Sequence, residues 1–264
     1  MPTTYAHDLS GKEVYKKLPS EMKAVIRRHG DLYRIGLHGP DILFYFMISK
    51  NPVSQFGVNM HKEKARAFFQ EGMRQVRRNK DEALLAYLLG FACHYLLDSA
   101  CHPYVNEMAD SGVVSHTVLE KEFDRVLMIE TDKDPAHYYP ACGVVPKMEY
   151  AKVIHRAIPL VRTANIYISL KMMKFLTNRM VCDDHGKRRR RIGKVLSVGG
   201  KNIGELVEHF MTENPDPRAV KPIQHLEKIY RESIEEAAEY LQELYTLTEA
   251  DYHLSSRWNR TYNG

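Results

Sequence analysis

One stretch of sequence, residues 83–100 (ALLAYLLGFACHYLLDSA), limits the choice of fold more than any other. Its apolar residues lie all round a helix instead of along one stripe, and such helices are buried in a protein core. The stretch carries His94 and Asp98, and His102 follows four residues later. Residues four apart share one face of a helix, so we expect imidazole, carboxylate and imidazole along one buried edge. Pro103 predicts that the helix ends at or before this point.

Helical periodicity extends over most of the remaining chain. It predicts helices over residues 62–78, 148–180 and 219–247, with Pro159 bending or splitting the second of them. No run of alternating β-branched residues predicts a strand. The pattern therefore indicates an all-α fold.

The length of 264 residues leaves room for one or two domains. We expect a single all-helical domain over residues 1–264, with a metal-binding half at 1–125 and a helical C-terminal part at 130–264. A separate helical unit after residue 200 is the alternative. The N-terminus lacks the apolar core of a signal peptide, so we expect a cytoplasmic protein. No window approaches the roughly 20 apolar residues that a membrane span needs.

Much of the formal net charge of +5 comes from residues 186–194, GKRRRRIGK. Such a run can contact phosphate groups, nucleic acid or an anionic surface. Binding of single-stranded nucleic acid usually adds aromatic side chains for stacking, and this run has none. We therefore interpret it as solvated, within a long exposed loop over residues 183–201.

A second set of metal-ligating residue types follows in SHTVLEKEFD. Ser115 is a predicted N-cap, and His116 and Glu120 then share one helix face. Buried carboxylates and histidines without partners are costly, and a metal ion is one good partner. Mixed nitrogen and oxygen ligands suit zinc, and also iron or manganese.

Three more candidate ligands lie at predicted element boundaries, where functional groups are often presented. His7 precedes the first helix, Asp41 follows the Gly39-Pro40 turn, and His61 precedes the helix at 62–78. Each of them taken alone is more often a structural residue. We interpret the remaining histidines as structural or exposed: His29, His38, His137, His155, His185, His209, His225 and His253.

The ordered motifs TTYAHDLSGKEVYKKLP, GLHGPDILFYF, MHKEKARAFF, YLLGFACHYLLDSACHPYV and SHTVLEKEFD resemble the zinc-dependent phospholipase C family. That family is related in fold to the zinc-dependent nucleases that cleave single-stranded nucleic acid. The resemblance covers residues 1–125 and implies an all-α fold with a metal cluster between central helices. It implies one zinc ion held by Asp41, His61, His94 and Asp98, and a second held by His102, His116 and Glu120.

In the family, a third zinc ion is bound by an N-terminal tryptophan, by a histidine that corresponds to His7, and by a carboxylate that corresponds to Asp98. This chain begins Met1-Pro2 instead. The resemblance therefore implies two or three zinc ions, while the ligand types alone also suit iron or manganese.

The resemblance also implies a phosphoric ester hydrolase in which a metal-activated water attacks phosphorus, with Asp41 as general base as well as ligand. The substrate would be a small phosphate ester or a lipid headgroup. Three alternatives stay open. The same site could serve a nuclease or nucleotidase, which the basic run favours. The adjacent pair His7-Asp8 suggests a helical phosphohydrolase of the His-Asp type, and a non-catalytic binding protein could use metals only as a brace.

Several aromatic side chains could line the cleft, although aromatic residues at helical spacing are more often core. They are Tyr5, Phe44, Tyr45, Tyr95 and Tyr104.

Overall fold

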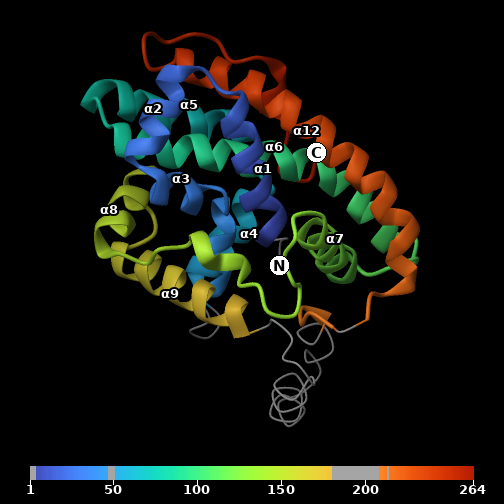
Figure 1. Ribbon diagram of the computed structural model, residues 1–264. Helices are drawn as coiled ribbons and strands as arrows, with labels where there is room; N and C mark the ends of the chain where they lie inside the picture. Colours follow the sequence, from blue (N-terminus) through green and yellow to red (C-terminus); the bar gives the residue numbers. More distant parts are fainter. Residues whose placement is uncertain (1–3, 47–50, 180–207, 213) are drawn as a thin grey trace.

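The computed structural model describes residues 4–46, 51–179, 208–212 and 214–264. Within these ranges the chain is all-α and contains no strand, which confirms the predicted fold class (Figure 1). The basic run at 186–194 and the loop predicted over 183–201 lie outside the described residues.

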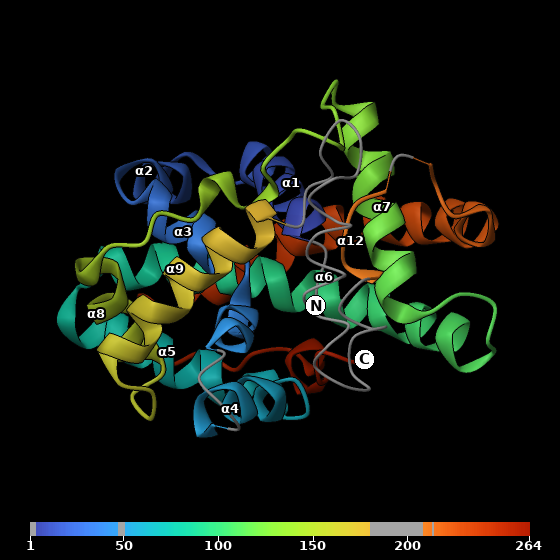
Figure 2. The same ribbon diagram turned by 90° about the horizontal axis from the view of Figure 1, so that it is seen from below.

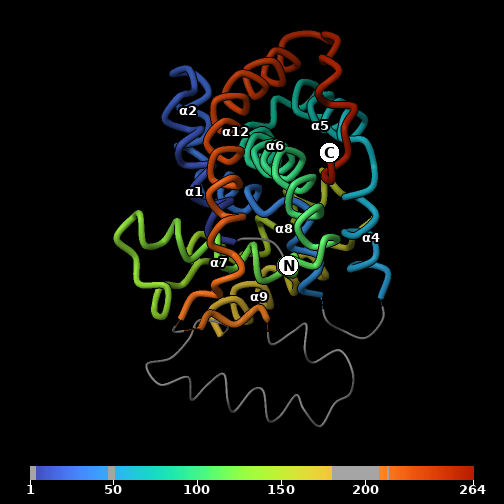
Figure 3. Tube along the Cα trace, turned by 90° about the vertical axis from the view of Figure 1, so that its right-hand side faces the viewer, coloured from blue at the N-terminus to red at the C-terminus, as the bar shows by residue number. Residues whose placement is uncertain are grey.

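Helix α6 (Glu82–Asp110) is the centre of the fold. Every residue from Leu84 to Ser99 is buried, so this stretch offers no face to water. Figure 3, which looks nearly along α6, shows other helices packed around it. The prediction of a central buried helix is confirmed. Its neighbours include α1 (Thr4–Lys17), α3 (Gly30–Gly36), α5 (Ala65–Asn79) and α12 (Val220–Thr246).

The prediction that this helix ends at or before Pro103 is wrong, because α6 continues to Asp110. A proline inside a helix removes one backbone hydrogen bond, here the one to the carbonyl of Ser99. Arg257 binds the preceding turn, donating from Nη2 to the hydroxyl of Ser99 and to the carbonyl of Leu96. Packing of α6 against α12 and α7 (His116–Glu130) also offsets the loss.

By length and mean hydropathy alone, α6 could cross a membrane, which the sequence analysis did not foresee. Of its most apolar window, however, 89% is buried inside the protein. No other helix in the described ranges meets the same criteria. Burial by neighbouring helices is the pattern of a core helix.

The other predicted helices are present with shifted ends. The segment 62–78 corresponds to α5, and 219–247 corresponds to α12. The segment 148–180 is two helices, and Pro159 lies in the break between them. The elements not yet given are α2 (Ser20–Arg28), η1 (Gly39–Tyr45), α4 (Pro52–Met60), η2 (Pro140–Gly143), α8 (Met148–Ala157), α9 (Thr163–Arg179), η3 (Pro217–Ala219) and η4 (Ser256–Asn259).

Helices α3 and α6 touch through their backbones. A Cβ added to Gly36 would lie 2.3 Å from the carbonyl oxygen of Tyr87, and one added to Gly90 would lie 2.1 Å from that of Tyr33. Only glycine allows this approach. This close contact places the end of α3 directly beside the middle of α6. The next element, η1, therefore begins next to α6 as well.

We therefore expect Gly90→Ala to lower the free energy of unfolding by at least about 1–3 kcal/mol, the usual cost of overpacking a core. Gly30→Ala is the matched control, because a Cβ there meets nothing within 4 Å. It should stay within about 0.5 kcal/mol of the unmodified protein. Urea denaturation measures both, and equal stabilities would contradict the close approach.

Candidate metal centre

Helix α6 supplies three side chains to the candidate site. His94, Asp98 and His102 follow one another along one edge, as their spacing predicts. Nε2 of His94 lies 3.1 Å from Oδ2 of Asp98, and Nδ1 of His102 lies 3.8 Å from the same oxygen. Asp98 is only 4% exposed, so its charge needs partners within the protein.

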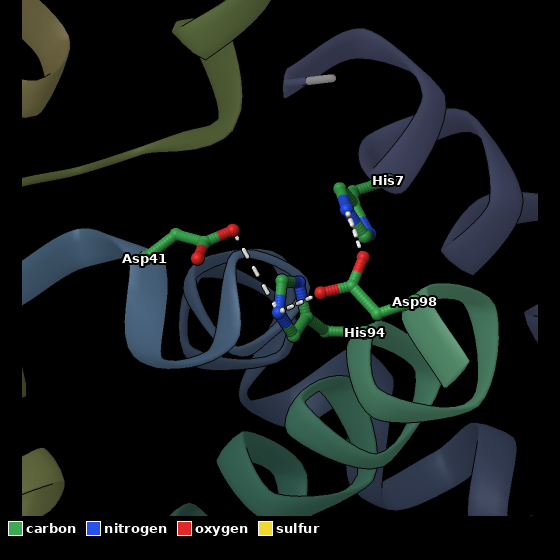
Figure 4. Close-up of side chains that lie close together, drawn as sticks. All are labelled: His7, Asp41, His94 and Asp98. Atoms are coloured by element: carbon green, nitrogen blue, oxygen red, sulfur yellow. Dashed lines mark ion pairs between the residues drawn. The ribbon is translucent and has the colours of Figure 1, made fainter. Parts of the chain in front are cut away.

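The short helix η1 brings Asp41 to this edge (Figure 4). Its first residue, Gly39, has a φ of +48°, and a Cβ there would lie 2.2 Å from the ring of His94. Both facts require glycine. The resulting turn places Oδ2 of Asp41 3.7 Å from Nε2 of His94, with the carboxylate buried.

Helix α1 adds His7 to the same group. Its ring stacks on His94 with centroids 4.3 Å apart, and its Nε2 lies 3.2 Å from Oδ1 of Asp98. Asp124 of α7 holds the start of α1 by accepting hydrogen bonds from two backbone N–H groups of its first turn, at 3.0 and 2.8 Å. Those groups have no acceptor inside a helix, so Asp124 caps α1 and fixes the position of His7.

The neighbouring Asp8 has different partners. It accepts two hydrogen bonds from Arg34 at 2.8 Å each and pairs with Lys12 at 2.6 Å. Burial opposes ionisation, but these two cations hold the pKa of Asp8 below its ordinary value. The pair His7-Asp8 is thus divided between a metal-ligand group and an ion pair, which argues against a His-Asp type of site.

His61, at the end of α4, approaches the first group from another side. Its Nε2 lies 3.0 Å from Oδ1 of Asp41 and 3.8 Å from Oδ2 of Asp98. Burial lowers the pKa of His61, but the carboxylates of Asp41 and Asp98 outweigh it and raise that pKa to about 8.

A second group lies further along α6, where α7 faces it. Oε1 of Glu120 lies 3.0 Å from Nε2 of His116 and 3.4 Å from Nε2 of His102. Ser115 caps α7 as predicted, accepting a hydrogen bond from a backbone N–H group at 3.3 Å. Despite burial, Asp98 and Glu120 raise the pKa of His102 to about 10. Burial alone would raise the pKa of Glu120. The charge of His116 and the contact of Glu120 with His102 outweigh burial and lower that pKa below its ordinary value.

Three histidines of the site share one hydrogen-bond arrangement. In each, Nδ1 faces an oxygen acceptor, so Nδ1 keeps the proton when the ring is neutral, and Nε2 then presents its lone pair. Histidines that bind metals generally have such a partner. The pairs are His61 with the carbonyl of Gly57 at 2.8 Å, His102 with the carbonyl of Tyr262 at 2.9 Å, and His116 with Oδ1 of Asn106 at 3.1 Å.

Several buried atoms of the site lack a hydrogen-bond partner among the described residues. Their charged neighbours are near but are not aligned for hydrogen bonds. A divalent cation would satisfy such atoms, so the donor set fits a metal ion. The atoms are Nδ1 of His7, both carboxylate oxygens of Asp41, both ring nitrogens of His94, Oδ2 of Asp98 and Oε2 of Glu120.

The structure brings all eight predicted ligands together, with one difference in grouping. The resemblance implied that His61 would complete the first set and that His7 would serve a third ion. In the structure, one ligand atom of His7 lies within 4.8 Å of one from each of Asp41, His94 and Asp98, and His61 borders this set. The second set is His102, His116 and Glu120, as implied.

Both groups open into one cavity of about 230 Å³. Figure 2 shows α4 and α7 on either side of α6, and residues in or beside these helices line the cavity. Besides candidate metal ligands, the residues that line the cavity are Phe44, Val58, Lys62 and Asn263. Of the aromatic residues considered for the cleft, Tyr5, Tyr45 and Tyr95 are buried in the core, and Tyr104 contacts His225.

Sequence reasoning missed the partners of the ligands. Asn106 lies on the same helix as His102, and a search of the helix for amide side chains could have suggested it. Tyr262 and Asn263 are remote from every other site residue in the sequence, and no local motif marks them. The capping of α1 by Asp124 depends on the packing of α7 against α1, which no local pattern in the sequence marks.

A family model described as zinc dependent phospholipase C matches residues 6–160, more than half of the chain. The match includes both groups of ligands and ends well before α12. Comparison with curated proteins and with solved structures gives no significant match.

We expect His116→Ala to remove one equivalent of bound metal while the ion of the first group stays. His116 contributes to the second group alone. His225→Ala is the matched control, since His225 belongs to neither group, and it should keep the full metal content. Elemental analysis after dialysis distinguishes these results, and loss of all metal from His116→Ala would mean that the groups do not bind separately.

Without metal, protonated histidines balance the buried carboxylates. The pKa values of His61 and His102 rise from 6.5 to about 8 and about 10, so the stability that protonation contributes is present below about pH 6.5. It is lost as the pH rises through those two values. The Tm of chelated protein should therefore fall from about pH 6.5 to about pH 10.

Metal binding displaces these protons. Calorimetry should accordingly show a much flatter profile for metal-loaded protein over the same range. A chelated protein whose Tm rose with pH would contradict the charge balance.

Proposed function

The chain belongs to the zinc-dependent phospholipase C family, and we propose that it is a phosphoric ester hydrolase acting on a phosphodiester with a small headgroup. The observation that carries the proposal is the pair of His/carboxylate groups that share one cavity and hold buried atoms without a hydrogen-bond partner in the part of the chain that the structure describes. Structural zinc sites are closed, whereas catalytic ones face open space.

The proposed zinc ligands are the residues of the two groups, with His61 in reach of the first. Zinc held there would lower the pKa of a bound water molecule and would provide positive charge for the phosphate oxygens. Three buried carboxylates line or border the cavity: Asp41, Asp98 and Glu120. Without cations they would repel a phosphate, so we expect phosphate binding to require loaded groups.

We propose that Asp41 accepts the proton of the attacking water. Its carboxylate lines the cavity, and neither oxygen has a hydrogen-bond partner among the described residues. It can therefore orient a water molecule and accept its proton. Lys62, exposed on the cavity wall, provides a cation for the outer phosphate oxygens.

The size of the cavity supports a small headgroup. Its 230 Å³ is less than the roughly 300–1,000 Å³ typical of sites for drug-sized ligands. A phosphate with a small substituent fits such a volume, while the remainder of a lipid would lie outside. Phe44 is the one aromatic residue besides histidine among the described lining residues, and its ring already stacks on His61. The cavity therefore offers little for stacking a nucleobase.

We expect purified protein to release a small phospho-headgroup from a glycerophospholipid, to lose this activity on chelation and to regain it with zinc. A panel of phosphodiesters, a 3′-nucleotide and single-stranded DNA tests the alternatives. Turnover of the nucleotide or DNA alone would identify a nuclease or nucleotidase instead. Full zinc content without turnover of any ester would favour a metal-braced binding protein.

Asp41→Asn keeps an oxygen ligand but cannot take up the proton, so kcat should fall about 10²–10⁴-fold while zinc content is largely kept. Asp31→Asn is the control. Asp31 lies outside the cavity, is partly exposed, and accepts a hydrogen bond from the hydroxyl of Tyr150. An Asp41→Asn protein of normal rate would remove Asp41 from the mechanism.

A further inference from the structure

The segment 256–264 returns from α12 to the metal centre, far beyond the residues that match the family model. Figure 3 shows it running between α5 and α6. Trp258 is fully buried and stacks on Tyr95 of α6, with ring centroids 5.7 Å apart. The hydroxyl of Tyr95 donates to the carbonyls of Arg257 and Arg260, at 2.7 and 3.2 Å. The segment is thus fixed to the helix that carries His94, Asp98 and His102.

Tyr262 joins this segment to ligands of both groups. Its carbonyl oxygen lies 2.9 Å from Nδ1 of His102, and its N–H donates to the carbonyl of His61 at 3.3 Å. Its buried ring packs against the rings of His61 and His94, with centroids 5.1 and 6.0 Å away. The next residue, Asn263, lines the cavity itself.

We infer that Tyr262 is a positioning residue of the metal centre, whose carbonyl fixes His102 with Nδ1 protonated and Nε2 available to the second ion. A carbonyl oxygen only accepts hydrogen bonds, so the proton must be on Nδ1. In that tautomer Nε2 faces Glu120 and carries the free lone pair. The inference rests on the proposed metal binding but not on any substrate.

His102 depends on this contact more than its neighbours do. It is followed directly by Pro103 and lies where α6 lacks a backbone hydrogen bond, so the helix alone holds it less firmly. The partners of His61 and His116, Gly57 and Asn106, lie within ten residues of them in the sequence. The partner of His102 comes from 160 residues away.

The first test measures the tautomer in the zinc-loaded full chain. Long-range ¹H–¹⁵N correlation on protein labelled at histidine reports which ring nitrogen carries the proton, and His102→Gln identifies the signals by their absence. We expect Nδ1 to be protonated. A proton on Nε2 of His102 would overturn the inference without any variant at Tyr262.

The second test measures zinc affinity by competition with a chelator. Tyr262→Ala keeps the backbone carbonyl but removes the buried ring that holds it beside His102. Loss of the partner of a metal-ligating histidine typically costs about 10–100-fold in affinity, and we expect a carbonyl released in this way to weaken one ion by up to this factor. Tyr262→Phe keeps the ring and the carbonyl. It loses only a hydroxyl without a hydrogen-bond partner among the described residues, so both ions should bind normally.

A His116→Ala background separates the second group from the first. There the second group is already incomplete, so Tyr262→Ala should change the affinity of the remaining ion much less. Equal zinc affinities for Tyr262→Ala and Tyr262→Phe in the otherwise unmodified chain would overturn the inference. A protein that binds zinc normally but hydrolyses no ester would defeat the proposed function and leave this inference standing.

Discussion

The burial of three carboxylates along or beside α6, whose stretch from Leu84 to Ser99 is buried throughout, is the constraint on which the rest of the structure depends. Asp41, Asp98 and Glu120 are each less than a tenth exposed. Charges so far from water need opposite charge at short range. The histidines provide it in part when they are protonated, and a divalent ion provides it more fully with neutral histidines as ligands. Most of the other features around the site position side chains close to these carboxylates.

The positions of the ligands depend on backbone geometry as much as on side-chain contacts. The contact at Gly36 and Gly90 sets α3 against α6, and Gly39 then turns the chain so that Asp41 faces His94. Asp124 fixes the first turn of α1, and with it His7. Because Asp124 lies on the helix that also carries Glu120, α7 supports both groups of ligands. A change in the position of α7 would therefore move ligands of both groups.

The sequence predicted those parts of the site that obey local rules. Four-residue spacing on an apolar helix indicated the edge formed by His94, Asp98 and His102, and the same spacing paired His116 with Glu120. Local rules failed where tertiary packing decides. Pro103 did not end α6, because contacts with α12, α7 and Arg257 outweigh one lost hydrogen bond. The order of motifs indicated the ligands but not that His7 would group with Asp41, His94 and Asp98 while His61 borders this set, since this depends on how α1 packs.

The hydrogen bond between Tyr262 and His102 has a consequence for the order of events during biosynthesis. Ribosomes make proteins from the N-terminus, so every ligand of both groups is synthesised before Tyr262. The ligands of the first group all lie in or before α6, and Asp124, which fixes His7, follows in α7, so this group could form around an ion early. The second group stays without the acceptor for His102 until the segment 256–264 has left the ribosome and packed on α6. The two groups would then form in sequence, and the second would be completed only when the segment 256–264 packs on α6.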